Sequence, residues 1–353
     1  MTVSYFSSAE KGADSVSTMS SEFKNQYVAG SDNDSIVEME DNLLNGQYKL
    51  LQVIGNGASA VVYKAEDTSR RKLVAIKKIN FGTLEELNST TSKEVSNLSL
   101  VKHKHITPLH EIFLDRVHKS VCLVMNFYEL GDLQKFMDQK IQKSEIVEEY
   151  YLVQILKQMA KALMYLHDTL HLVHRDVKPL NIFVESLTKD TIKVCLGDFG
   201  LSRSRKSLKY DIHEGHLMVG TPKFMSPNLS NNDMTETAQV YSSVDSISDR
   251  FGSFASALLS EPSNDTFSAS DIFALGCTLY QLMSLDLRTD IMQLYHDNDF
   301  ESDVFSQLQS RIKQNYNGYS NELMDVVLSM VGRDEFKRPT ARQVLFMSKK
   351  IKN

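Results

Sequence analysis

Residues 174–181 of this chain carry an unusual density of groups that could do chemistry. The run His-Arg-Asp-Val-Lys-Pro-Leu-Asn places the carboxylate of Asp176, the ammonium group of Lys178 and the amide of Asn181 close together along the chain. A second carboxylate, Asp198, follows in an Asp-Phe-Gly sequence. Phosphoryl transfer needs such a set, because it requires a base, a cation for the moving phosphate and oxygen ligands for magnesium. These residues therefore predict a phosphoryl-transfer site.

An earlier segment supplies backbone that could approach a phosphate. The turn Gly55-Asn56-Gly57-Ala58 lies between two stretches of strand character. Its two glycines let the backbone come close to phosphate oxygens without an intervening Cβ. A dinucleotide-binding fold would need a helix after this loop, whereas a strand is expected here. An ordinary glycine-rich hairpin is the alternative for this turn.

The bulk composition is that of a soluble globular protein, with 42% hydrophobic and 24% charged residues among 353. The net charge of −6 does not suggest a nucleic-acid binder, since those usually carry a basic face. No stretch approaches about 20 apolar residues, and the first residues lack the basic and apolar regions of a secretory signal, so neither a membrane span nor secretion is expected. Cys122, Cys195 and Cys277 each sit in an apolar setting. They are expected to be buried thiols of a cytoplasmic or nuclear protein.

Local patterns divide the chain into a part with strands and a part with helices. Strands are expected where apolar and polar residues alternate, and helices where apolar residues recur at the helical period. The expected strands are Tyr48–Gly55, Ala60–Glu66, Leu73–Ile79 and Val121–Phe127, and the expected helices are Leu84–Lys102, a long helix with one face from Leu152 to Leu166, Ala269–Ser284 and Asn321–Val331. This order predicts an α+β fold. Residues 1–46 and 229–267 are Ser- and Asp-rich and are expected to form a disordered tail and a disordered or functional insertion.

The motifs, taken in order, resemble those of a eukaryotic-type serine/threonine protein kinase over about residues 47–348. The glycine turn precedes a Val-Ala-Ile-Lys strand, and the run at 174–181 precedes Asp-Phe-Gly. The phrases Gly-Thr-Pro-Lys-Phe-Met-Ser-Pro (220–227) and Leu-Gly-Asp-Phe-Gly-Leu-Ser-Arg (196–203) look most like the NIMA-related kinase group. The resemblance implies a two-lobed fold with a small β-rich N-lobe (47–125), a hinge (126–131), a larger helical C-lobe (132–348) containing the 229–267 insertion, and tails at 1–46 and 349–353.

The resemblance also implies ATP and Mg²⁺ as cofactors and a role for each catalytic residue. Asp176 would be the base that accepts or orients the substrate hydroxyl, and Lys178 would neutralise the γ-phosphate. Lys77 would contact the α- and β-phosphates. Glu94 would hold Lys77, with a solvated acid on a helix surface as the alternative. Thr221 would touch both Asp176 and Lys178, as in kinases that phosphorylate serine and threonine.

The expected nucleotide site draws on the glycine turn, the strands around it and the hinge. Asn181 and Asp198 would bind magnesium, which prefers hard oxygen ligands. Met125 would be the gatekeeper and Asp132 would lie near the ribose, although packing and a helix N-cap are the alternatives for these two residues. The expected nucleotide-binding residues are Ile54, Gly55, Asn56, Gly57, Ala58, Val62, Ala75, Lys77, Met125, Phe127, Asp132, Asn181 and Asp198.

Further residues near the catalytic run are expected to act on the structure. The resemblance makes Asp271 the helix acid that braces the catalytic loop, and His174 is expected to pack this loop. His167 and His171 lie nearby, but no thiol or carboxylate completes a tetrahedral zinc set. A histidine at a helix end and a histidine in a loop are expected instead.

Two departures from the family pattern concern the activation segment. The segment usually ends in Ala-Pro-Glu, whereas this chain has Ser-Pro-Asn at 226–228, so Arg338 is expected to lose its ionic partner. The usual phosphorylatable residue is absent from 216–219. We therefore expect regulation that does not use the usual site. The nearest phosphorylatable residues are Ser202, Ser204, Ser207 and Tyr210.

Three functions compete for this set of residues. The favoured one is an active kinase that transfers the γ-phosphate of ATP to Ser/Thr hydroxyls of protein substrates. The main alternative is a pseudokinase scaffold that keeps the fold with weak or no turnover, and Asn228 is the main argument for it. A small-molecule kinase of related fold is disfavoured by Thr221. No nucleic-acid or membrane partner is expected, and a regulatory partner could use the 229–267 insertion or the N-terminal tail.

Overall fold

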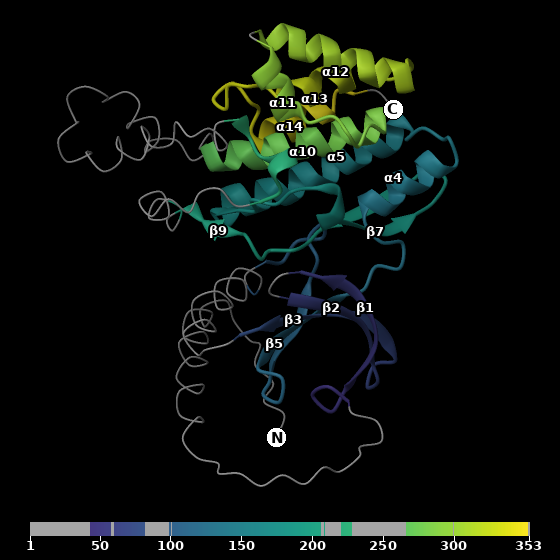
Figure 1. The fold of residues 1–353 in the computed structure, drawn as a ribbon, viewed down its shortest axis with the longest axis vertical. Helices are drawn as coiled ribbons and strands as arrows, with labels where there is room; N and C mark the ends of the chain where they lie inside the picture. The colour runs from purple at the N-terminus through teal and green to yellow at the C-terminus, as the bar shows by residue number, and fades with distance from the viewer. Residues whose placement is uncertain are drawn as a thin grey trace, which may run out of the picture. The chain divides into compact units, whose positions relative to one another are not determined.

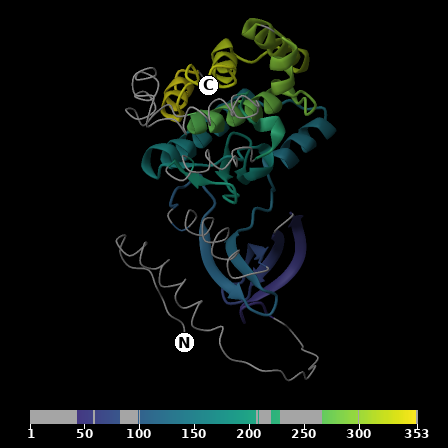
Figure 2. The same ribbon diagram turned by 60° about the vertical axis from the view of Figure 1, so that its left-hand side comes forward.

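The computed structural model of the chain divides into two compact units, each with its own core (Figure 1, Figure 2). Unit 1 is Met1–Leu100 with Pro108–Phe127, and unit 2 is Val101–Thr107 with Tyr128–Asn353. The residues that the structure describes are 43–57, 60–81, 99, 101–205, 208, 220–227, 266–298 and 300–351. Residues 1–42 and most of the 229–267 segment lie outside this set, as do Ala58, Glu94, Ser207, Tyr210 and Asn228.

In the described residues the strands and helices are largely segregated along the chain, as the expected α+β class requires, with five strands first and most helices later. In chain order they are β1 (Tyr48–Asn56), β2 (Ala60–Asp67), β3 (Lys72–Asn80), β4 (Leu109–Asp115), β5 (Ser120–Asn126), α4 (Leu133–Gln142), α5 (Glu149–Met164), the π-helical turn η2 (Tyr165–Thr169), β6 (Leu172–Val173), the 3-10 turn η3 (Pro179–Asn181), β7 (Ile182–Leu187), β8 (Ile192–Leu196), β9 (Arg203–Ser204), the 3-10 turn η4 (Pro222–Phe224), α10 (Thr266–Ser284), α11 (Ile291–Asp297), α12 (Glu301–Asn315), α13 (Asn321–Met330) and α14 (Ala341–Ser348). The predicted fold class is confirmed.

Unit 1 is built on one antiparallel sheet of order β1-β2-β3-β5-β4. The four strands expected from the sequence are present as β1, β2, β3 and β5, within one residue of the expected ends. The sequence analysis missed β4. Its residues Leu-His-Glu-Ile-Phe-Leu-Asp mix charged and apolar positions without strict alternation, so only pairing with β5 makes them a strand.

One face of this sheet forms the core of unit 1. Val74 and Ile76 of β3 and Cys122 and Val124 of β5 are almost fully buried against Tyr48. Because side chains alternate along a strand, the residues between them point to the opposite face of the sheet. That opposite face carries Val62, Ala75, Lys77 and Met125, which are cross-strand neighbours in register.

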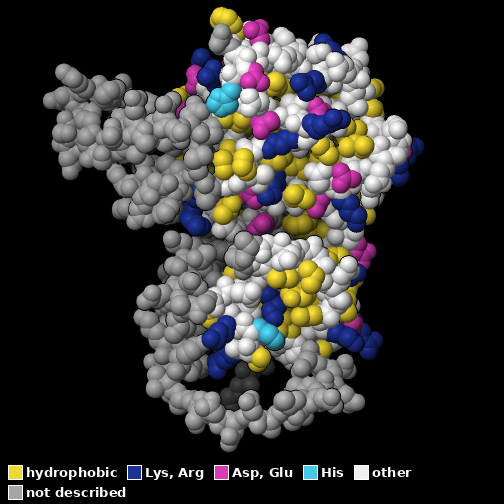
Figure 3. Space-filling view, viewed as in Figure 1, with side chains coloured by type: hydrophobic (Ala, Val, Ile, Leu, Met, Phe, Trp, Pro, Cys, Tyr) yellow, Lys and Arg dark blue, Asp and Glu magenta, His cyan; other side chains and the backbone are white. Residues whose placement is uncertain are grey.

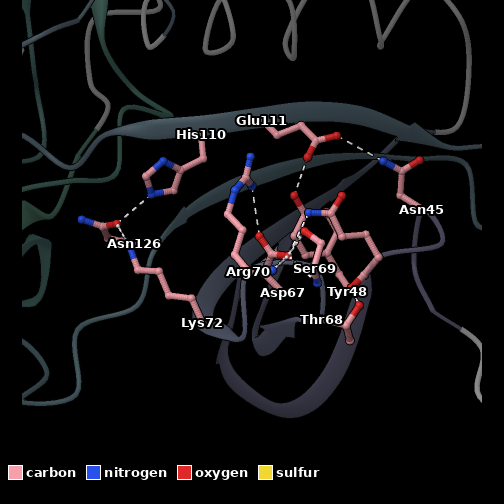
Figure 4. Close-up of polar contacts among 11 residues, drawn as sticks. Asn45, Tyr48, Asp67, Thr68, Ser69, Arg70, Lys72, His110, Glu111 and Asn126 are labelled. Carbon is pink, nitrogen blue, oxygen red and sulfur yellow. Dashed lines mark hydrogen bonds and ion pairs between the residues drawn. The ribbon is translucent and has the colours of Figure 1, made fainter. Parts of the chain in front are cut away.

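Polar contacts join the start of β1 to β4 and to the end of β2 (Figure 4). The Tyr48 hydroxyl donates to Glu111, and the Tyr48 ring stacks on Phe113 with centroids 5.7 Å apart. Asp67 accepts from Gln47 at 2.9 Å and from Arg70 at 3.0 Å. Burial alone would raise the pKa of Asp67, but hydrogen bonds from Ser69, Gln47 and Arg70 outweigh it and hold this pKa far below its usual value.

Unit 2 is helical and is organised around α5 and α10. The periodic apolar face predicted for the long helix is the buried face of α5. Helix α10 is buried on all sides from Ser268 to Ser284 and begins three residues before the predicted start. The predicted helix Asn321–Val331 is α13, capped by the Ser320 side chain. The sequence analysis did not find α4, α11, α12 or α14, although Thr340 and Gln343 form a capping box for α14.

The predicted helix Leu84–Lys102 falls mostly outside the described residues. Ser99 is helical, whereas Val101 and Lys102 are not, so the predicted helix end is too late. The chain makes a turn at residues 103–106 and then bridges the end of β8: Leu196 N donates to His105 O at 2.9 Å, and Thr107 N donates to Leu196 O at 2.8 Å. This pairing places residues 101–107 in unit 2.

The three cysteines are buried and none forms a disulfide, as expected. Burial raises the pKa of Cys122 to about 11 and that of Cys195 to about 12, so both thiols stay protonated near neutral pH. None of the described helices is both long and apolar enough to cross a membrane.

We predict that His105 makes the stability of this chain fall as the pH falls. Burial lowers the pKa of His105 from 6.5 to about 4, and its Nδ1 donates to Val194 O at 3.3 Å. Between these two pH values the unfolded chain binds a proton at His105 that the folded chain does not. The contribution of neutral His105 to the unfolding free energy is therefore complete above about pH 7 and decreases toward pH 4. The loss at pH 5 should be about 1 kcal/mol.

The measurement is the midpoint of urea unfolding at several pH values for the wild type and for His105→Gln. The variant should lose part of the pH dependence between pH 7 and pH 5. His296→Gln, at an exposed histidine on α11, is the matched control and should keep it. An identical pH dependence in the wild type and His105→Gln would contradict the prediction.

Candidate active site

The carboxylate of Asp176 is the centre of a compact polar cluster in unit 2. It lies between β6 and η3 and is 9% exposed. The Thr221 hydroxyl donates to Oδ1 at 2.8 Å. The Lys178 ammonium lies 2.7 Å from Oδ2, and the Asn181 amide donates to Oδ2 at 2.9 Å. Four residues that the sequence placed in one site are therefore in direct contact, although Thr221 is distant from the other three along the chain.

Lys178 and Thr221 are also bonded to each other, which closes the cluster. The Lys178 ammonium donates to the Thr221 hydroxyl oxygen at 2.7 Å. The Thr221 hydroxyl thus accepts from a cation and donates to a carboxylate, which fixes the position of all three side chains. This arrangement agrees with the expectation that Thr221 touches both Asp176 and Lys178.

Gly220 allows Thr221 to reach this position. Its φ of +127° lies in a region that residues with a side chain rarely adopt. A Cβ added at Gly220 would come within 2.7 Å of the Arg175 carbonyl oxygen. The absence of a side chain at Gly220 therefore lets the 220–227 segment lie directly against the catalytic loop.

Asp271 of α10 binds the backbone of the loop at residues 174–181, which we call the catalytic loop. Its carboxylate accepts from the backbone N–H groups of His174 and Arg175, each at 2.8 Å, and from Nε2 of His167 at 2.8 Å. Burial alone would raise the pKa of Asp271, but the contacts with His167 and His174 outweigh it and lower this pKa. The predicted bracing role of Asp271 agrees with these bonds. The sequence analysis missed the part that His167 plays in them.

His174 packs the loop, as expected. It is fully buried, and its Nε2 donates to Gly197 O at 3.0 Å. Its ring meets the edge of Phe199 with centroids 4.9 Å apart. Because both contacts lead to the Asp-Phe-Gly sequence, His174 ties the catalytic loop to the segment that carries Asp198.

Asn181 and Asp198 stand at the same end of the two-stranded β7–β8 ribbon. Strand β7 begins directly after Asn181, and its first residue pairs with the last residue of β8. Gly197 N donates to Asn181 O at 2.8 Å, which leaves Asp198 one residue further. Both hydrogen bonds of the Asn181 side chain use its amide nitrogen. The amide oxygen and the Asp198 carboxylate are therefore the atoms that fit a hard cation.

Asp198 is held in an uncommon backbone conformation, with a φ of +58°. Arg175 has a φ of +70°. Such values cost on the order of 1–3 kcal/mol for residues other than glycine and persist where the surrounding contacts over-determine them. For Arg175 that contact is the bond from its N–H to Asp271.

The expected nucleotide-binding residues of unit 1 share the face of the sheet opposite the core. Ala75 and Lys77 are two residues apart on β3, with Val62 opposite Lys77 and Met125 opposite Ala75. Cross-strand partners point to the same face. The sheet therefore presents a methyl group, two larger apolar side chains and an ammonium group together.

The glycine turn shows no steric need for glycine within the protein itself. A Cβ added at Gly55 would meet Val62 at 3.5 Å, and one added at Gly57 would meet Ala60 O at 3.5 Å, both ordinary contacts.

Hydrophobic side chains gather on the surface of unit 1 over β1 and β2 (Figure 3). Ile54, next to the turn, is 44% exposed. Ala58 and Glu94 lie outside the described residues, so their expected roles stay predictions.

Phe127 and Asp132, expected near the nucleotide, also have structural contacts. Asp132 is the N-cap of α4 and accepts from Lys135 N at 2.9 Å, which is the alternative that the sequence left open. Burial raises the pKa of Asp132. The Phe127 ring has the Lys64 ammonium 4.9 Å from its centroid.

Arg338 anchors the end of the 220–227 segment. Its guanidinium group donates to the Ser226 hydroxyl at 2.6 Å and to the carbonyl oxygens of Gly332 and Arg333 at 2.7 and 3.0 Å. Burial lowers the pKa of Arg338 to about 10, which keeps it charged at neutral pH. Asn228 lies outside the described residues, and Ser226 is an anchoring residue that the sequence analysis missed.

The candidate phosphorylation sites differ in access. Ser202 is fully buried and its hydroxyl donates to Phe199 O at 2.8 Å. A kinase would therefore have to unfold this turn to reach Ser202. Ser204 is partly exposed at the end of β9. Ser207 and Tyr210 are outside the described residues.

Comparison with known proteins matches residues 48–244 to the protein kinase domain family. Serine/threonine-protein kinase Nek2 of Mus musculus is 27% identical over 307 residues, which cover 84% of this chain and 58% of that protein. Serine/threonine-protein kinase Nek4 of Mus musculus is 27% identical over 304 residues, 84% of this chain and 32% of that protein. The probable serine/threonine-protein kinase zyg-1 of Caenorhabditis briggsae is 33% identical over 195 residues, 55% of this chain and 25% of that protein. The chain thus spans little more than half of Nek2 and less of the others, and the resemblance to the NIMA-related group is supported.

We predict that Gly220→Ala lowers the unfolding free energy by about 2 kcal/mol, since the new methyl group meets the Arg175 carbonyl and φ is unfavourable. Urea unfolding measures the change. Gly55→Ala is the matched control, because its methyl group meets only Val62 at an ordinary distance, and it should change stability by less than about 0.5 kcal/mol. Equal losses in the two variants would contradict the close approach at Gly220.

Proposed function

Because this chain belongs to the protein kinase domain family, we propose that it transfers the γ-phosphate of ATP to serine and threonine hydroxyl groups of protein substrates. The observation that carries the proposal is the cluster of Asp176, Lys178 and Thr221, in which a carboxylate, an ammonium and a hydroxyl are mutually bonded within 2.8 Å. Each group has a use in phosphoryl transfer to a hydroxyl.

In this proposal Asp176 receives the substrate hydroxyl. Its carboxylate would orient the O–H group and accept its proton, while the γ-phosphorus exchanges its bond to the β–γ bridging oxygen for a bond to the hydroxyl oxygen and ADP leaves. Lys178, 2.7 Å from this carboxylate, offers the charge that offsets the negative charge of the transferred group. Thr221 holds Lys178 and Asp176 at this spacing, so the set is preorganised before the substrate arrives.

The residues present fit ATP with Mg²⁺. Asn181 and Asp198 offer an amide oxygen and a carboxylate from one end of the β7–β8 ribbon, and these are ligands that Mg²⁺ prefers. Lys77 and Ala75 offer a cation for phosphates and a small apolar surface for a base. Bound ATP with Mg²⁺ supplies the phosphoryl group and part of the neutralising charge. A Cβ at Gly55 or Gly57 would make only ordinary contacts within the protein. The proposal therefore assigns these glycines to the close approach of a phosphate.

The substrates in this proposal are proteins, and the site of action is the cytoplasm or the nucleus. The serine/threonine kinases Nek2 and Nek4 support a protein as acceptor. Residues 1–46 and the 229–267 segment, which lie mostly outside the described residues, are the candidates for contact with a regulatory partner.

We predict that the chain labels a generic protein substrate on serine and threonine with Mg²⁺ and ATP. Asp198→Ala should lower the rate by about 100-fold or more, because it removes a ligand that positions the phosphates. Asp190→Ala removes an exposed carboxylate from the β7–β8 turn of the same unit, and it should keep the rate.

Label transfer in this assay distinguishes the kinase from the scaffold. Equal transfer by the wild type and Asp198→Ala would mean contamination. No transfer by a folded wild type that still binds ATP would favour a pseudokinase, and transfer restricted to tyrosine would contradict the proposed acceptor.

We further predict that Thr221→Val lowers kcat by about 10- to 100-fold, since Lys178 and Asp176 lose the hydroxyl that joins them. Thr221→Ser keeps the hydroxyl and should retain most of the activity. Steady-state kinetics should show this loss with a nearly unchanged KM for ATP. An equal kcat for the two variants would show that the hydroxyl has no part in positioning.

A further inference from the structure

Helix α14 lies antiparallel to α5 in unit 2, and this places two lysines side by side. An ion pair of 2.8 Å joins Arg342, near the start of α14, to Asp168, just beyond the end of α5. Lys349 is seven residues after Arg342, and Lys161 is seven residues before Asp168. On one side these seven residues span α14 to its C-cap, and on the other they run back through the π-helical turn η2 into the last turn of α5. The charge of Lys349 acts on Lys161, as expected if the two lie near each other, and Lys157 lies one turn further along the same face of α5.

The loop at 101–107 brings a further lysine to the same place. The Tyr165 hydroxyl accepts from Lys102 N at 3.2 Å, and the Tyr165 ring stacks on His103 with centroids 5.2 Å apart. Tyr165 is one turn after Lys161. These contacts bring the exposed Lys104 to the end of α5. We call Lys104, Lys157, Lys161 and Lys349 the lysine patch.

The side chains of the lysine patch act on one another electrostatically. The pKa of Lys161 is lowered by burial and then by the charges of Lys104, Lys349 and Lys157. The pKa of His103 is lowered by burial and then by Lys104 and Lys161. Like charges held this close destabilise the free protein. Within the part of the chain that the structure describes, no ion pair to an acid neutralises any of the four lysines, although the chain has 45 acidic residues against 39 lysines and arginines.

An exposed aromatic side chain stands next to the lysine patch. Phe346 of α14 is 61% exposed. Lys350 lies over its ring, 4.8 Å from the centroid. Phe346 and Lys349 are three residues apart and so share one side of α14. Phe346 therefore offers one apolar contact, with cations beside it, at the edge of the lysine patch.

We propose that the lysine patch binds an Asp- and Glu-rich segment of a partner protein, with Phe346 packing on an apolar residue of that segment. Charge complementarity identifies the occupant as an anion. The cations of the patch are all lysines, whereas the arginine beside them, Arg342, is engaged by Asp168. Lysine ammonium groups pair with carboxylates as point charges and need no fixed fork geometry, so the side chains of a flexible Asp- and Glu-rich segment can satisfy them.

The net charge of the chain favours a short acidic segment over a long polyanion. A nucleic acid or an anionic membrane extends over much of a protein surface, and a chain of net charge −6 repels it. At physiological salt the screening length is about 8 Å, so the attraction from the patch acts only over about that distance. A peptide segment fits inside this range. The proposal does not depend on phosphoryl transfer, because none of these residues belongs to the Asp176 cluster.

The test is direct binding to the full chain, measured by fluorescence anisotropy with a short labelled peptide of Asp and Glu around one Leu. A peptide with Asn and Gln in place of the acids is the control ligand. The acidic peptide should bind more tightly than the control peptide. Its affinity should be lower at about 0.15 M salt than at low salt. The variant Lys157→Glu with Lys161→Glu should weaken binding by about tenfold or more.

The matched control variant is Lys143→Glu with Lys313→Glu, which changes the same charge at exposed lysines at the C-cap of α4 and on α12 and should change binding by less than about twofold. Phe346→Ala should weaken binding with an unchanged salt dependence. All variants should keep the unfolding midpoint of the wild type within a few degrees and phosphorylate a neutral substrate at the wild-type rate. Equal binding by the two double variants would overturn the proposal. Tighter binding of an oligonucleotide or of anionic vesicles at equal charge would overturn it as well.

Discussion

The buried carboxylate of Asp271 is the interaction on which the catalytic loop depends. A charge in the core of a protein is costly unless hydrogen bonds satisfy it. Here two backbone N–H groups and the His167 ring supply those bonds. The need to satisfy Asp271 keeps the loop backbone against α10, and this holds Arg175 in its unfavourable φ. The next residue is Asp176, so the position of the proposed base follows from the packing of a core helix.

Helix α10 anchors a second segment by the same principle. Phe273 is two residues after Asp271, and the Arg338 guanidinium lies over its ring, 4.9 Å from the centroid. Arg338 also donates to Ala269 O at 3.4 Å and to the Ser226 hydroxyl. The family pattern led us to expect weaker anchoring, because Asn228 stands where a glutamate usually pairs with this arginine. In the described residues, hydroxyl and carbonyl oxygens accept hydrogen bonds from Arg338, and the bond to Ser226 holds the 220–227 segment to this arginine.

The sequence predicted the parts of the site whose residues are close together along the chain. Asp176, Lys178 and Asn181 lie within six residues, and the structure joins them as expected. Strand β3 was found from its β-branched residues and β5 from its continuous apolar run. Helix α12 was missed because it buries only Val304, Leu308 and Ile312, a stripe that is too narrow to stand out from its polar residues. The bond from His167 to Asp271 spans 104 residues, and no local pattern encodes such a pairing.

Buried charges in unit 2 have hydrogen-bond partners, whereas the surface lysines of the lysine patch repel one another. Buried Asp271 and Arg338 have hydrogen-bond partners on several sides. The clustered lysines of α5, α14 and the 101–107 loop instead repel one another. Surface charges are rarely worth much in stability, so nothing in the folding of unit 2 requires four of them together. A partner that brings carboxylates relieves this repulsion, and the relief adds to the attraction between the two surfaces. The affinity of the patch for an acidic segment therefore comes from charge attraction that the lysines do not find among the described residues of unit 2.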